Sequence, residues 1–406
     1  MQQLTNPYTP NAGAEPKAIV GRNDELESFA VLLHRVRDGM AEQSMIITGL
    51  RGVGKTVLLG RFRDKALRED CVVVEWEVSK HSTDDFRREI ASRIRTALLE
   101  VSPKARWGNR ARNAAGVLRS FSLSVDPAGA LTAGFGVDAV EGYGDHAQLG
   151  LDLTDLLVAV GEAAKEHGRV IVILVDEIQY LARDQMEALI EALHKTVQRN
   201  LPVTLVAAGL PQVGALANDA KTYAERLFKF VPIGNLSQED AALALALPAA
   251  DRGVEWAQDA LTLAFGVTGG YPYFIQEVGY AVWPVAEGPV IGVEDVREAL
   301  PGYQAKLDQS FFRVRLERAT QLQTSYLRAM AELGPDPQRA QDVAALMGRK
   351  SNQLGPVRAQ LVDLGLLYTP ERGLAAFTVP QFDQYLRRIM PELDLPALRG
   401  GTGLQH

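Results

Sequence analysis

The feature that most constrains the fold of this chain is a glycine-rich loop between a short apolar strand and a helix. Residues 49–56 read Gly-Leu-Arg-Gly-Val-Gly-Lys-Thr and fit the pattern GxxxxGK(S/T) without a mismatch. The apolar run at residues 44–48 predicts the strand, and residues 55–68 predict the helix. Glycines let such a loop point its backbone N–H groups at an anion, and the helix adds its positive N-terminal dipole. The loop therefore predicts an α/β fold that binds the phosphates of a nucleoside triphosphate.

We assign specific roles to the residues of this loop. Lys55 is expected to reach the β- and γ-phosphates as a catalytic cation, and the Thr56 hydroxyl is expected to ligate Mg²⁺. The alternative is a tight strand–helix turn that happens to carry a lysine, and its position between strand and helix argues against it. The predicted nucleotide contacts in this part of the chain are Gly49, Leu50, Arg51, Gly52, Val53, Gly54, Lys55, Thr56 and Val57.

A second apolar strand, predicted at residues 170–175, ends in two carboxylates. Asp176 is the residue expected to hold Mg²⁺, and Glu177 is expected to act as the general base toward the attacking water. Acidic residues also favour an ordinary helix start, which is the alternative. Because the loop and the acidic strand occur in the expected order, ATP or ADP with Mg²⁺ is the predicted ligand.

Strands and helices alternate up to about residue 235, which is typical of a parallel sheet with crossover helices. Within this alternating region we expect an insertion, in which strands at residues 121–125 and 131–137 pair as a hairpin. Helices without strands follow, and then the order helix, helix-turn-helix, hairpin that is typical of a winged helix. The predicted parts are an extended arm (1–15), an ATPase domain (16–235), a helical lid (236–315), a winged helix-turn-helix domain (318–390) and a tail (391–406).

Charge and cysteine content narrow the function further. The net charge is −7, so any contact with nucleic acid needs a local basic face. Polar and basic residues do gather on the expected recognition helix and the turn before it: Arg349, Lys350, Asn352, Gln353, Arg358 and Gln360. Such side chains suit contacts with double-stranded DNA. The alternative is a solvated helix face in a winged helix that contacts protein. A single cysteine, Cys71, cannot form a disulfide framework, and we expect a cytoplasmic protein without a signal peptide or a membrane span.

The loop, the Asp-Glu strand and the Val-Gly-Arg-x-x-Glu-Leu stretch at residues 20–26 together resemble AAA+ P-loop ATPases. The resemblance is to the branch of origin-recognition ATPases and STAND signalling switches, including actinobacterial ATP-binding proteins. It implies a P-loop NTPase parallel sheet with helices on both faces, followed by an all-helical lid and a winged helix-turn-helix domain.

The resemblance also implies roles for residues outside the loop. Val20 and Gly21 would lie against the adenine, Pro272 would touch the nucleotide from the lid, and Arg226 would act on a neighbouring subunit of a homo-oligomer. A surface arginine is the equal alternative for Arg226. Two departures from the family pattern imply slow hydrolysis: residues 207–209 (Ala-Ala-Gly) offer no polar sensor, and Tyr273 replaces a sensing arginine.

Two functions remain open at this point. One is an ATPase that couples ATP binding and slow hydrolysis to a conformational change on or near DNA. The other is a STAND-like nucleotide switch whose winged helix contacts protein. A small-molecule kinase is a remote third reading, because the helical and winged-helix extension is large.

Overall fold

The computed structural model describes residues 1–393 except residues 12, 80–81 and 104–106, so most of the predicted tail (391–406) lies outside the described residues. Contacts between Cα atoms divide the chain into two compact units. The sheet unit comprises Arg22–Gly49 and Gly54–Ile233, and the C-terminal unit comprises Met1–Gly21, Leu50–Val53 and Gly234–His406.

The sheet unit is built on five parallel strands in the order β2-β3-β4-β1-β5. β1, the strand before the glycine loop, lies between two neighbours and is fully buried, as its apolar sequence requires. The strands are β1 Ser44–Thr48, β2 Val72–Glu77, β3 Ile171–Asp176, β4 Val203–Gly209 and β5 Phe228–Pro232.

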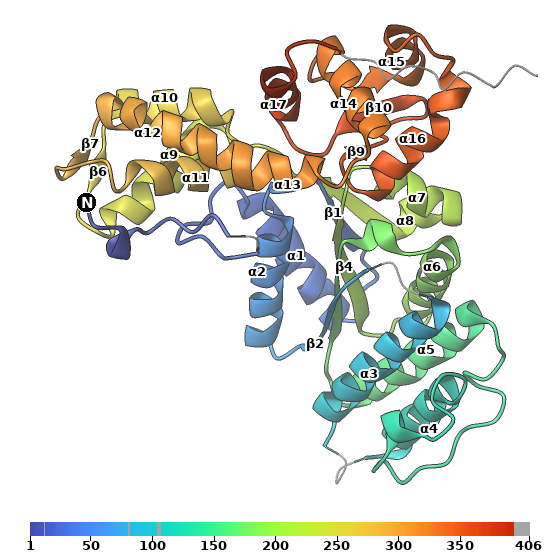
Figure 1. The fold of residues 1–406 in the computed structure, drawn as a ribbon. Helices are drawn as coiled ribbons and strands as arrows, with labels where there is room; N and C mark the ends of the chain where they lie inside the picture. The colour runs from blue at the N-terminus through green and yellow to red at the C-terminus, as the bar shows by residue number, and fades with distance from the viewer. Residues whose placement is uncertain (12, 80–81, 104–106, 394–406) are drawn as a thin grey trace, which may run out of the picture. The chain divides into compact units, whose positions relative to one another are not determined.

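Helices cover both faces of this sheet (Figure 1), which confirms the predicted fold class. One face carries α1 (Asn23–Arg37) and α2 (Lys55–Arg68). The other face carries α3, α5 and α6, and a short pair of helices precedes β5. The bounds are α3 Thr83–Val101, α5 Leu149–Glu166, α6 Arg183–Gln198, α7 Val213–Ala220 and α8 Ala224–Leu227.

The hairpin predicted at residues 121–137 is wrong. Its first strand is the end of helix α4 (Asn109–Leu123), and residues 130–132 form one turn of 3₁₀ helix. This segment is helical because one continuous face of the helix is buried, formed by Ala111, Ala114, Ala115 and Leu118. Residues 124–148 return to α5 as an irregular connection.

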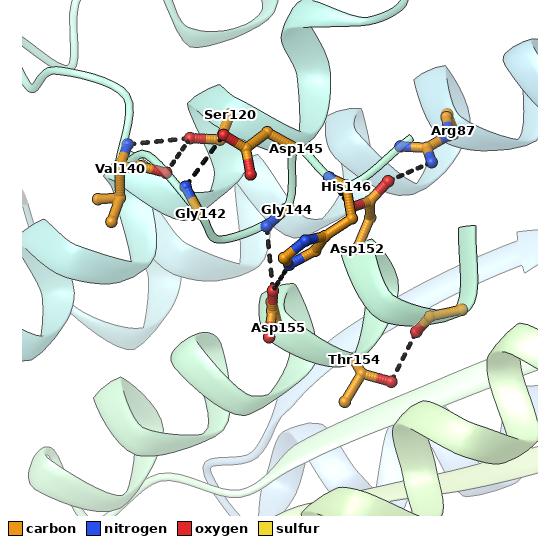
Figure 2. Close-up of polar contacts among 11 residues, drawn as sticks. Arg87, Ser120, Val140, Gly142, Gly144, Asp145, His146, Asp152, Thr154 and Asp155 are labelled. Carbon is orange, nitrogen blue, oxygen red and sulfur yellow. Dashed lines mark hydrogen bonds and ion pairs between the residues drawn. The ribbon is translucent and has the colours of Figure 1, made fainter. Parts of the chain in front are cut away.

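This connection is fixed to the helices by polar contacts (Figure 2). The Ser120 hydroxyl accepts a hydrogen bond from the Val140 N–H at 2.9 Å, and the Gly144 N–H donates to Asp155 at 3.1 Å. Arg87 and Asp152 form an ion pair of 2.5 Å in which the two side chains are only 7% and 1% exposed. The buried pair therefore joins α3 to α5.

The N-terminal arm packs on the helices that follow residue 234 in the C-terminal unit. The Tyr8 hydroxyl donates to the Leu245 carbonyl at 2.7 Å and accepts from the Trp256 indole N–H at 2.8 Å. Two short paired strands, β6 (Glu255–Trp256) and β7 (Val290–Ile291), were not expected from the sequence. The helices of this region are α9 Gln238–Ala250, α10 Gln258–Thr268, α11 Pro272–Val282, α12 Val293–Lys306 and α13 Arg313–Leu316.

Residues 321–389 contain the three helices and the hairpin that the sequence predicts, with an additional strand, β8, and a final helix, α17. Strand β10 lies between β8 and β9 and is antiparallel to both. The elements are α14 Gln321–Leu333, β8 Gln338–Arg339, α15 Ala340–Leu346, α16 Ser351–Asp363, β9 Leu367–Tyr368, β10 Leu374–Phe377 and α17 Phe382–Ile389.

Candidate nucleotide site

The carboxyl ends of β1, β3 and β4 meet at one edge of the parallel sheet, and the candidate site lies there. The Gly49 N–H, directly after β1, donates to the Gly209 carbonyl at the end of β4 at 3.1 Å. Lys55 opens α2 and is only 6% exposed, and its ammonium donates to the Gly49 carbonyl at 3.0 Å. Gly54 has φ of +96°, a conformation that favours glycine. The lysine is therefore held over the start of the loop.

The two predicted Mg²⁺ ligands are in direct contact. The Thr56 hydroxyl donates to Asp176 Oδ2 at 2.6 Å, and the Glu177 N–H donates to Asp176 Oδ1 at 2.8 Å. Burial raises the pKa of the Asp176 carboxyl, and these two hydrogen bonds offset part of that shift. Two oxygen ligands this close, one of them a carboxylate that is costly to ionise, suit a hard divalent cation.

Glu177, the predicted base, has a backbone φ of +54°, which is uncommon for a residue that is not glycine. Its carbonyl accepts the Tyr180 N–H at 3.0 Å, and its carboxylate accepts a hydrogen bond from the side-chain amide of Gln179. Sequence reasoning did not single out Gln179. The available signal was a polar side chain two positions after the glutamate, between the apolar Ile178 and the aromatic Tyr180.

The middle of the glycine loop, residues 50–53, groups with the C-terminal unit. There the Arg51 N–H donates to the Thr378 carbonyl at 3.3 Å, and the Tyr271 hydroxyl donates to the Arg51 carbonyl. Gly52 has φ of +80°, and a Cβ atom at this position would collide with the Tyr271 hydroxyl. The amide of Arg51, which the sequence assigns to a phosphate, is thus hydrogen-bonded within this unit.

The residues that the family resemblance adds lie in both units. In the C-terminal unit, Val20 is half-buried, Gly21 has φ of +63° with the Asp240 carboxylate where a Cβ would point, and Pro272 is the first residue of α11. In the sheet unit, Arg226 is exposed on α8. Its role in a neighbouring subunit stays a prediction.

The two departures from the family pattern have a structural description. Ala207 and Ala208 are buried in β4. Tyr273 donates its hydroxyl to Glu277 at 2.7 Å and stacks on Phe311 with 4.7 Å between ring centroids. The Tyr273 side chain therefore makes its hydrogen bond and its ring contact within the C-terminal unit.

The residues expected to contact DNA lie on and before α16. Lys350, Asn352 and Gln353 are exposed, whereas Arg349 and Arg358 are half-buried. The Gln353 side chain accepts the Lys350 N–H at 3.0 Å at the start of the helix. The Gln360 side chain accepts a hydrogen bond from Gln323 at 2.8 Å.

None of the helices in the described part of the chain has the length and hydrophobicity of a membrane span.

Comparison with known proteins bears on the fold of this chain. Residues 18–206 match the family model of the AAA ATPase domain, and residues 309–386 match a domain of unknown function (DUF8462). A Walker-type ATPase of Pyrococcus abyssi is 16% identical with a TM-score of 0.57, covering 92% of this chain and 97% of that one. The ORC2 protein of Aeropyrum pernix, solved in ADPNP–ADP complexes, is 16% identical with a TM-score of 0.50, covering 94% and 98%. Comparison with curated proteins gave no match. The two solved structures share the fold of this chain, and over residues 18–206 the chain is similar in sequence to the AAA ATPase domain family.

Proposed function

We propose that the chain binds ATP with Mg²⁺ at the carboxyl edge of its sheet and hydrolyses it slowly to ADP and phosphate. One observation carries the proposal: the buried Lys55, the Thr56–Asp176 pair and Glu177 lie together at the ends of β1 and β3. A tight turn with an incidental lysine would not need a hydroxyl and a carboxylate 2.6 Å apart beside it.

The residues have separate tasks in this reaction. Glu177 takes a proton from water while the water oxygen bonds to the γ-phosphorus, and the bond from that phosphorus to the bridging oxygen breaks, leaving the electron pair on ADP. Lys55 stabilises the negative charge on the phosphates. Thr56 and Asp176 would hold Mg²⁺, which when bound neutralises part of the phosphate charge.

Slow turnover is supported by what surrounds the site. Residues 207–209 supply no polar side chain to the γ-phosphate, and Tyr273 is bonded to Glu277. Fewer preorganised donors at the developing charge mean less stabilisation of the transition state. The reaction then suits a protein that changes conformation with nucleotide state.

We further propose that residues 318–390 form a winged helix that acts on or near double-stranded DNA. The exposed Lys350 and Asn352 at the start of α16 support this, since such side chains serve phosphate and base-edge contacts. The alternative is a STAND-like switch in which the same face contacts a protein. ATP turnover measured with and without duplex DNA separates the two, because only the first predicts stimulation that is lost as salt is raised.

Nucleotide binding is tested by Lys55→Met and Glu177→Gln in calorimetry and phosphate-release assays. Loss of charge-assisted hydrogen bonds from Lys55 should weaken ATP binding by about 10-fold or more. Glu177→Gln should keep the ATP affinity and lower turnover by about 100-fold or more. The matched control is Lys65→Met, which removes a surface lysine paired with Glu69 on the same helix and should change neither quantity. Unchanged ATP affinity in Lys55→Met would refute the site.

A further inference from the structure

Gln179 connects the candidate base to the end of strand β4. Its side-chain Oε1 accepts the backbone N–H of Leu210 at 3.1 Å, and its Nε2 donates to Glu177 Oε2. A backbone N–H can only donate, so Oε1 must face Leu210 and the NH₂ group must face the glutamate. The strand end therefore fixes which way the amide points.

The strand end also leaves room for Gln179 only because residue 209 is glycine. A Cβ atom on Gly209 would lie 2.7 Å from Gln179 Oε1 and 2.6 Å from the Val213 side chain. The carbonyl of the same Gly209 accepts the Gly49 N–H at the start of the phosphate loop. The end of β4 thus touches the phosphate loop through Gly209 and the base through Gln179.

Glu177 needs such support because its backbone is strained. A φ of +54° costs about 1 kcal/mol in a residue with a side chain, and it persists only where neighbouring contacts fix it. The Asp176 carboxylate and the Tyr180 N–H fix the Glu177 backbone, while Gln179 fixes its carboxylate. The hydrogen bond from Gln179 goes to Oε2 of Glu177, so the other carboxylate oxygen, Oε1, is the one assigned to the water.

We infer that Gln179 is a positioning residue for ATP hydrolysis, which orients the Glu177 carboxylate from the end of β4. The inference rests on the proposed function. In this arrangement the end of β4 acts on the site indirectly: the N–H of Leu210, directly after the strand, holds the Gln179 side chain, which in turn contacts Glu177. Residues 207–209 of β4 themselves carry no polar side chain. ATP binding does not depend on the contact, since Gln179 bonds neither Lys55 nor the Thr56–Asp176 pair.

The test compares two glutamine-to-methionine variants of the full chain. Gln179→Met keeps the length of the side chain and removes both hydrogen bonds; we expect kcat to fall about 10-fold, part of the 100-fold or more that a general base supplies, with KM and ATP affinity within twofold. Gln185→Met is the matched control, because Gln185 is also buried but lies at the start of α6, where it accepts the Ala182 N–H. It should lower the melting temperature and leave kcat within twofold.

A second comparison asks whether Gln179 acts through the glutamate. In the Glu177→Gln background, adding Gln179→Met should change the residual single-turnover rate by less than twofold, because no carboxylate remains to orient. Equal losses in both backgrounds, or a wild-type kcat in Gln179→Met, would overturn the inference while leaving the site intact. A wild-type chain that binds no ATP or shows no turnover would instead overturn the proposed function and the inference with it.

Discussion

Replacing Arg87 by methionine should destabilise the sheet unit strongly, through the carboxylate that it leaves behind. Asp152 is 1% exposed and would keep one hydrogen bond, from the His146 N–H at 2.8 Å. Removing one partner of a buried ion pair typically costs about 3–5 kcal/mol, because the remaining charge is buried without compensation. Methionine fills most of the space of the arginine stem, so little of this cost comes from a cavity.

Thermal unfolding followed by circular dichroism measures the effect. In a unit of 150–250 residues, 1 kcal/mol shifts the melting temperature by roughly 2–4 °C, so the transition should fall by about 6–20 °C. Adding Asp152→Asn should recover most of the loss, since the amide carries no charge and its oxygen still accepts the His146 N–H. The result would be specific to the charge rather than to the side-chain volume.

The control lies on the same helix. Arg93 pairs with Glu89 at 2.8 Å with side chains 48% and 40% exposed, and such i,i+4 pairs contribute about 0.3–0.5 kcal/mol. Arg93→Met should therefore shift the transition by about 2 °C or less. Equal shifts in the two arginine variants, or no recovery in the Arg87→Met/Asp152→Asn double variant, would refute the reasoning from buried charge.

Two further predictions concern the nucleotide site. Burial raises the pKa of Asp176, so the contribution of its carboxyl to stability is present at low pH and is lost as pH rises through that raised pKa. The nucleotide-free Asp176→Asn variant should therefore melt at a higher temperature than wild type at pH 8 and at the same temperature near pH 4. A constant difference in melting temperature across the pH range would exclude ionisation as the cause. If Arg226 acts on a neighbouring subunit, turnover per subunit should rise with protein concentration, and mixing Arg226→Ala with Lys55→Met chains should restore activity that neither has alone. Flat activity on dilution and an inactive mixture would make Arg226 a surface residue.

The parts of the site that could be predicted are those that lie close together in the sequence. The glycine loop indicates a strand before it and a helix after it, and the short apolar run before Asp176 and Glu177 favours a buried strand that ends in two carboxylates. The contact of Gln179 with Leu210 could not be predicted, because it depends on the parallel register of β3 and β4 across 31 positions. Arg87 and Asp152 are 65 positions apart and meet only once α3 and α5 have packed.

The hairpin prediction failed for a different reason. Residues 121–125 alternate apolar and polar side chains as a strand does, but Phe121 continues the buried face of α4. A five-residue alternation is compatible with the last turn of a helix, and the burial of Ala111, Ala114 and Ala115 over the preceding turns decides between the two.

The order of strands in the sheet has a consequence for how the chain is made. β1 pairs with β4 and β5 and not with β2, the strand that follows it in the sequence. When β1 leaves the ribosome, its nearest strand partner is still unmade: Ser44 meets Thr204, 160 residues later. At 5–20 residues per second, this delay is about 10–30 s, during which the five residues of β1, all buried in the folded chain, have no strand on either side. A ligand at the carboxyl edge can stabilise the nascent chain only after β4 has emerged, because the ends of β1 and β4 both border that edge.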